Sequence, residues 1–71
     1  MSNSKPITQI EAETLRLIQI FIQKNGYSPT IAELAESAGV FNNAMCERIA
    51  RLHHKGAITK TPRIARSIRL A

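Results

Sequence analysis

The 71-residue sequence has few of the features that staple small proteins together or carry out reactions. It contains a single cysteine, Cys46, so no disulfide can form within it. One cysteine and two histidines are too few for a typical structural zinc site. No pair of carboxylates, Ser-His-Asp set or glycine-rich phosphate loop stands at a workable spacing. We therefore expect no metal, no cofactor and no enzymatic activity.

Long hydrophobic runs are also missing. The first ten residues, MSNSKPITQI, lack the apolar centre of a signal peptide, and no apolar run approaches the roughly 20 residues that span a membrane. We expect a cytoplasmic protein with no membrane partner. The length allows one small domain with one modest core. We place this domain at residues 8–71, after a flexible polar N-terminus at residues 1–7.

Acidic residues are absent from the last third of the chain. The five glutamates all lie within residues 1–47, which have a net charge of −2, whereas residues 48–71 carry seven lysines and arginines. So much positive charge in one part of a small domain is unfavourable unless a polyanion neutralises it. Nucleic acid does so, with release of counterions. A basic face kept for solubility is the alternative.

The central stretch, residues 30–56, has the pattern of two short helices joined by a tight turn. Thr30 and Glu33 have the spacing of a capping box, which begins a helix, and Gly39 suits the left-handed backbone that ends one. The apolar residues between them repeat as one buried helix face: Ile31, Leu34, Ala35 and Ala38. A second helix is predicted at about residues 42–54, capped by one of two asparagines. This arrangement indicates a helix-turn-helix, a motif that reads the major groove of DNA.

A helical wheel of the second helix separates a buried face from an outward one. With Ile49 at the centre of the buried face, Met45, Leu52 and His53 fall within about 60° of it, and Cys46 lies at the edge. The outward face carries an amide, a small apolar group, a carboxylate and two guanidiniums, which match the edges of bases. A simple solvated face is the alternative. The predicted base-contacting residues are Asn43, Ala44, Glu47, Arg48 and Arg51.

Regular structure is also predicted on both sides of this motif. A first helix begins at Thr8, with Glu11 at the capping-box position, and stops at Gly26. Beyond residue 56, alternation at residues 57–60 and 66–70 predicts two strands, with Ile58, Ile68 and Leu70 covering the helices. The fold is thus mostly α with a small β-hairpin, a three-helix winged helix-turn-helix. The predicted phosphate-contacting residues are Thr30, His54, Lys55, Lys60, Arg63 at the tip of the wing, and Arg66.

Two questions about partners stay open at this stage. A monomer of this size contacts about 4–6 base pairs, too few to single out one site in a genome, so we expect a homodimer or paired sites on double-stranded DNA. The other interpretation is a winged helix that binds a protein, either another regulator or RNA polymerase. An exposed apolar patch from Ile20, Ile31 or Phe41 would then form the contact.

A set of residues between positions 8 and 70 matches the pattern of a known family. The matching residues are Thr8, Gly26, Pro29-Thr30, Ala32-Glu33-Leu34-Ala35, Gly39, Asn43-Ala44, Glu47, Leu52, Lys55-Gly56, Ile58 and Ser67-Ile68-Arg69-Leu70. With these residues the chain resembles the N-terminal DNA-binding domain of LexA, the repressor of the SOS response. The resemblance implies a winged domain whose third helix enters the major groove, with Asn43, Ala44 and Glu47 contacting bases. A transcriptional regulator, most simply a repressor, is therefore the expected function.

The sequence also departs from that family in several places. The turn at residues 40–42 is one residue shorter and lacks the usual Ser-Pro, and Cys46 stands where a second base-reading acid is expected. Arg48 and Arg51 are more basic than the family pattern. The family's self-cleaving, dimerising Ser-Lys domain has no counterpart in these residues, so we expect no regulation by autoproteolysis. A compact regulator from a phage or other mobile element is the source that this size suggests.

Overall fold

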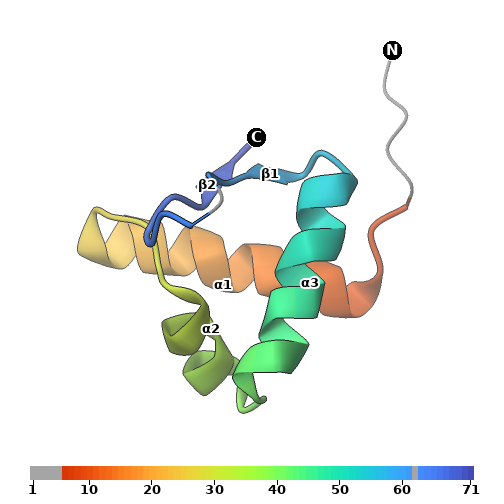
Figure 1. The fold of residues 1–71 in the computed structure, drawn as a ribbon, viewed down its shortest axis with the longest axis horizontal. Coiled ribbons are helices and arrows are strands. Elements are labelled where there is room, and N and C mark those ends of the chain that lie inside the picture. Colours follow the sequence, from red (N-terminus) through yellow and green to blue (C-terminus); the bar gives the residue numbers. More distant parts are fainter. Residues whose placement is uncertain (1–5, 62) are drawn as a thin grey trace.

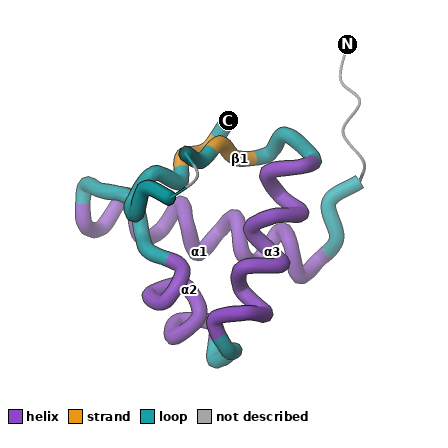
Figure 2. The backbone as a smooth tube through the Cα atoms, viewed as in Figure 1, coloured by secondary structure: helices purple, strands orange, loops and turns teal. Residues whose placement is uncertain are grey.

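The computed structural model describes residues 6–61 and 63–71, and within them three helices precede a two-stranded hairpin. The helices are α1 (Gln9–Asn25), α2 (Ile31–Ala38) and α3 (Asn42–His54), and the strands are β1 (Ile58–Thr59) and β2 (Arg69–Leu70). Figure 1 shows α3 crossing α1 at a steep angle, with α2 and the hairpin on opposite sides of α1. Figure 2 shows that only short loops separate the three helices. The predicted fold class is confirmed.

The first two helices begin and end as the sequence predicts. The Thr8 hydroxyl accepts a hydrogen bond from the Glu11 amide at 3.2 Å, and the Glu11 carboxylate accepts one from the Thr8 amide at 3.1 Å. Thr30 and Glu33 repeat this arrangement at the start of α2. Gly26 and Gly39 end the two helices in the left-handed conformation, with φ angles of 78° and 72°.

The start of α3 differs from the prediction. Neither Asn42 nor Asn43 is the cap, because Phe41 takes the N-cap position and no side chain caps the helix. The turn is short, and the Val40 amide already donates to the carbonyl of Ala35 in α2 at 3.0 Å. Phe41 is therefore extended, and the asparagines fall inside the first turn.

The core is aliphatic and draws on every helix and on both sides of the hairpin. Eight residues form one buried cluster: Ile18, Leu34, Ala35, Met45, Ile49, Leu52, Ile58 and Ile68. Val40, in the turn between α2 and α3, packs against this cluster. Because α2 and α3 share this core, their relative orientation is fixed by packing rather than by the turn alone.

The hairpin is shorter than predicted. Its strands pair antiparallel, with Ile58 opposite Leu70 and Thr59 opposite Arg69. Ile58 and Ile68 are buried as expected, whereas Leu70 is 43% exposed, so it covers the helices only in part. The predicted second strand fails at its start because Arg66 has a positive φ of 57°, which breaks the extended backbone.

The predicted flexible segment, residues 1–7, is described only in part. Residues 1–5 lie outside the described residues, whereas the carbonyl of Pro6 accepts a hydrogen bond from the Lys55 ammonium at 2.9 Å. Among residues 6–61 and 63–71, no helix is long and apolar enough to cross a membrane.

Candidate nucleic-acid interface

The outward face of α3 is rotated from its predicted position. Met45, Ile49 and Leu52 are buried, so the buried face is centred roughly 30° away from Ile49, toward Leu52. Cys46 and His53, predicted to be at or near the buried face, are exposed. Both of those placements were wrong because α1 and α2 pack against the other flank of α3, which a wheel of one helix does not show.

The five predicted base-contacting residues fall into two groups as a result. Asn43, Glu47 and Arg51 are exposed, whereas Ala44 and Arg48 are half-buried. Arg48 lines a groove with residues of α1 and α2, away from the hairpin. The exposed group occupies the middle of the outward face, and the half-buried group forms its border with α1 and α2.

Glu47 and Arg51 form an ion pair along the exposed side of α3. Their side chains approach to 3.7 Å and are 71% and 58% exposed. Such an exposed pair contributes little to stability, so it is easily exchanged for other partners. It also explains locally why a carboxylate persists among so many cations, since Arg51 offsets its charge.

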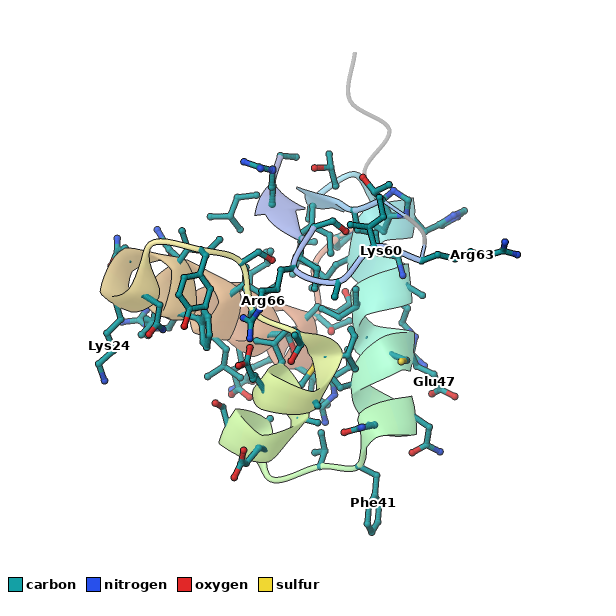
Figure 3. All side chains as sticks on the ribbon, turned by 60° about the vertical axis from the view of Figure 1, so that its left-hand side comes forward. Lys24, Phe41, Glu47, Lys60, Arg63 and Arg66 are labelled. Atoms are coloured by element: carbon teal, nitrogen blue, oxygen red, sulfur yellow. The ribbon has the colours of Figure 1, made fainter. Side chains whose placement is uncertain are left out.

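Several of the predicted phosphate-contacting residues line one groove. The groove has a volume of about 260 Å³ and lies between the start of α2 and the hairpin, where Thr30, Lys60, Arg63 and Arg66 meet. Figure 3 shows Arg63 and Glu47 projecting toward the same side of the molecule, so the hairpin loop and the outward face of α3 share one surface. His54 lies with Arg51 on a second shallow hollow at the end of α3.

Lys55 has a structural role instead of the predicted phosphate contact. Its ammonium forms an ion pair with Glu11 of α1, and both side chains are largely buried, with exposures of 13% and 4%. The hydrogen bond from Lys55 lowers the pKa of the Glu11 carboxyl below its usual value, assisted by the amide of Thr8. Because this pair joins the end of α3 to the start of α1, the structure does not support a phosphate contact for Lys55.

Arg66 is likewise engaged inside the domain. Its guanidinium donates to both carboxylate oxygens of Glu33 at 2.9 Å and to the carbonyl of Ser28 at 3.0 Å. It also lies 4.8 Å from the centre of the Tyr27 ring, which itself packs edge-on against Phe21 of α1. These contacts leave Arg66 as a link between the hairpin and α2, so its predicted phosphate contact is not supported.

The ion pairs offset part of the positive charge of residues 48–71. Three of the seven cations pair with glutamates of the first 47 residues, so part of the predicted repulsion is offset internally. Within the described part of the chain, no ion pair involves the other four: Arg48, Lys60, Arg63 and Arg69. These four side chains can therefore bind a polyanion without breaking an ion pair of the domain.

Sequence reasoning missed three exposed residues of the outward face: Cys46, Ala50 and His53. A helical wheel centred on the mean direction of the three buried residues of α3 places Ala50 on the outward side and Cys46 at its border. It places His53 as close to the buried face as the half-buried Arg48, so only the packing of α1 and α2 distinguishes those two. Phe41, which the protein-binding interpretation expected to be exposed, is 84% exposed.

A three-helix core, a helix-turn-helix formed by α2 and α3, and a hairpin beside it define a winged helix-turn-helix protein. A family model described as the LexA DNA binding domain matches residues 4–67. The chain therefore belongs to the LexA DNA-binding domain family, which confirms the resemblance seen in the sequence.

Individual relatives agree with this membership. The chain is 42% identical over 65 residues to a LexA repressor of Pseudomonas chlororaphis, covering 90% of the chain and 32% of that protein. It is 37% identical over 67 residues to a LexA repressor of Methylococcus capsulatus, and 35% identical over 66 residues to one of Thermosipho melanesiensis. In both cases the match covers 93% of the chain and 33% of the relative. The chain thus spans about a third of the length of these relatives.

Proposed function

We propose that this domain binds double-stranded DNA in a sequence-specific way and acts as a transcriptional repressor, by occupying its site and without catalysing a reaction. In this proposal α3 enters the major groove, where Asn43, Glu47 and Arg51 contact base edges, with Ala44 and Arg48 at the border of the contact. Lys60, Arg63, Thr30 and His54 contact the phosphates on either side.

One observation carries the proposal: the exposed face of α3 and the cationic hairpin loop lie on the same side of the molecule (Figure 3). An amide, a carboxylate and a guanidinium along one helix face suit base edges. Lys60 and Arg63, beside them, have no ion-pair partner among the described residues and suit phosphates. A helix exposed only for solubility would need no such neighbour.

Selection of bound sequences from a random duplex library tests the proposal directly. We expect enrichment of one short motif, and binding to it that weakens by orders of magnitude between 50 and 200 mM salt if six or more phosphates are contacted. Glu47→Ala and Arg51→Ala should alter the selected bases. Recovery of no motif, together with no binding to duplexes at low salt, would refute the proposal and favour a protein partner.

We also propose that two copies occupy paired half-sites. One copy presents a single recognition helix, and two-fold related copies would read half-sites separated by about one turn of DNA. Sedimentation of the protein with the selected duplex should give two copies per high-affinity site. A single copy bound with undiminished affinity would contradict the pairing while leaving the DNA-binding proposal intact.

A further inference from the structure

Among the described residues, the most exposed large apolar side chain lies at the N-terminal end of α3. Phe41 is 84% exposed, compared with 60% for Ile64 and 51% for Tyr27. Figure 3 shows its ring projecting beyond the first turn of α3 and away from the body of the domain. Packing in the core therefore does not explain why a phenylalanine occupies this position.

The fold does not account for Phe41 by helix capping either. Phe41 occupies the N-cap of α3 and makes no side-chain hydrogen bond there, although serine, threonine, aspartate and asparagine are the residues that stabilise this position. Asparagine follows at both of the next two positions, where it cannot cap the helix. The chain thus forgoes a stabilising contact at this site and presents an aromatic ring to solvent.

The surroundings of Phe41 favour DNA over a protein as its partner. The exposed residues next to Phe41 in the chain are Gly39, Asn42 and Asn43, and the half-buried Val40 packs against the core. No exposed apolar side chain therefore adjoins Phe41 along this segment. An interface with a protein would ordinarily supply a larger apolar area around an aromatic anchor. Asn43, two residues away, belongs to the outward face of α3 that the proposed function places against bases.

We infer that Phe41 contacts the 5-methyl group of a thymine at the end of the half-site. The N-terminal residues of a recognition helix are the ones that approach base edges. The thymine methyl is the apolar group on those edges, and apolar side chains including phenylalanine recognise it. This inference rests on the proposed function and adds to it a preference for thymine at the base pair beyond those that Asn43 reads.

A deoxyuridine scan tests the contact without altering the protein. Each thymine of the selected duplex is replaced in turn by deoxyuridine, which keeps every hydrogen-bonding group and removes only the methyl. At one thymine near the end of each half-site, binding of the unaltered protein should weaken about fourfold, as expected for losing burial of one methyl-sized group. Phe41→Ala should bind the original duplex more weakly and be insensitive to deoxyuridine at that position.

Phe41→Asn separates this role from any role in folding. Because asparagine can cap α3, this variant should unfold at a higher temperature than the original protein while binding the selected duplex more weakly. Specific binding by the original protein with no thymine coupled to Phe41 would overturn the inference and leave the proposed function standing. Loss of all DNA binding by the original protein would instead refute the proposed function.

Discussion

Arg66 in the loop of the hairpin holds the carboxylate of Glu33 in α2 through two parallel hydrogen bonds of 2.9 Å each. The same carboxylate accepts a hydrogen bond from the backbone amide of Thr30 at 2.9 Å. The group that caps α2 therefore also anchors the hairpin. Because α2 packs on α3 in the shared core, this contact fixes the hairpin loop relative to the helix proposed to read DNA.

Arg66→Gln should loosen that anchor. We expect the thermal unfolding midpoint to fall by about 5 °C and the affinity for the selected duplex to fall as Arg63 loses its fixed position. A double-mutant cycle with Glu33→Gln measures the coupling, since the second substitution should add little to the first. Arg69→Gln, which removes an exposed arginine from β2, is the matched control. Effects of Arg66→Gln and Glu33→Gln that simply add would contradict the anchoring role.

The free energy of unfolding should decrease as the pH falls below the ordinary pKa of glutamate. Hydrogen bonds from Lys55 and Arg66 lower the folded-state pKa of Glu11 and Glu33 from 4.5, so the unfolded chain takes up protons first as the pH falls. Their stabilising contribution is complete above pH 4.5 and is lost as the pH drops through the lowered values. Urea unfolding midpoints measured from pH 6 to pH 3 should decrease accordingly. The double variant Glu11→Gln, Glu33→Gln should show a much flatter profile.

Lys55→Met should mainly affect folding. It leaves the Glu11 carboxylate buried without its cation, and an unpaired buried charge is strongly unfavourable. We expect the thermal midpoint to fall by more than about 10 °C, while the slope of log affinity against log salt, measured below the midpoint, stays unchanged. A lower slope with unchanged stability would restore Lys55 to the phosphate-contacting set.

Arg63→Ala should mainly affect DNA binding and leave folding nearly unchanged. The exposed Arg63 side chain has no ion pair among the described residues, so its removal should leave the unfolding midpoint nearly unchanged. Affinity for all duplexes should fall alike, and the salt slope should decrease by about one for the lost phosphate contact. Fluorescence titrations at several salt concentrations provide the measurement. A change in the selected base preference would instead show that Arg63 reads bases.

Features set by neighbouring residues were predictable from the sequence. The capping boxes at Thr8 and Thr30 and the glycine ends of α1 and α2 depend on contacts within about four residues, and all are present. The predicted N-cap of α3 was wrong, although capping is also a local interaction. The ability of asparagine to cap a helix does not reveal at which position the turn places it. The candidate base-contacting residues remain predictions, and the structure orders them by exposure.

By itself the sequence determined the helices, the tight turn, the hairpin and the concentration of positive charge, since these follow from spacing, turn chemistry and composition along the chain. Tertiary structure alone decided which cations remain for DNA. Lys55 meets Glu11 across 44 residues and Arg66 meets Glu33 across 33. The same packing rotated the outward face of α3 and left Phe41 at its leading end. These outcomes depend on how three helices pack together, and no periodicity within one helix contains that information.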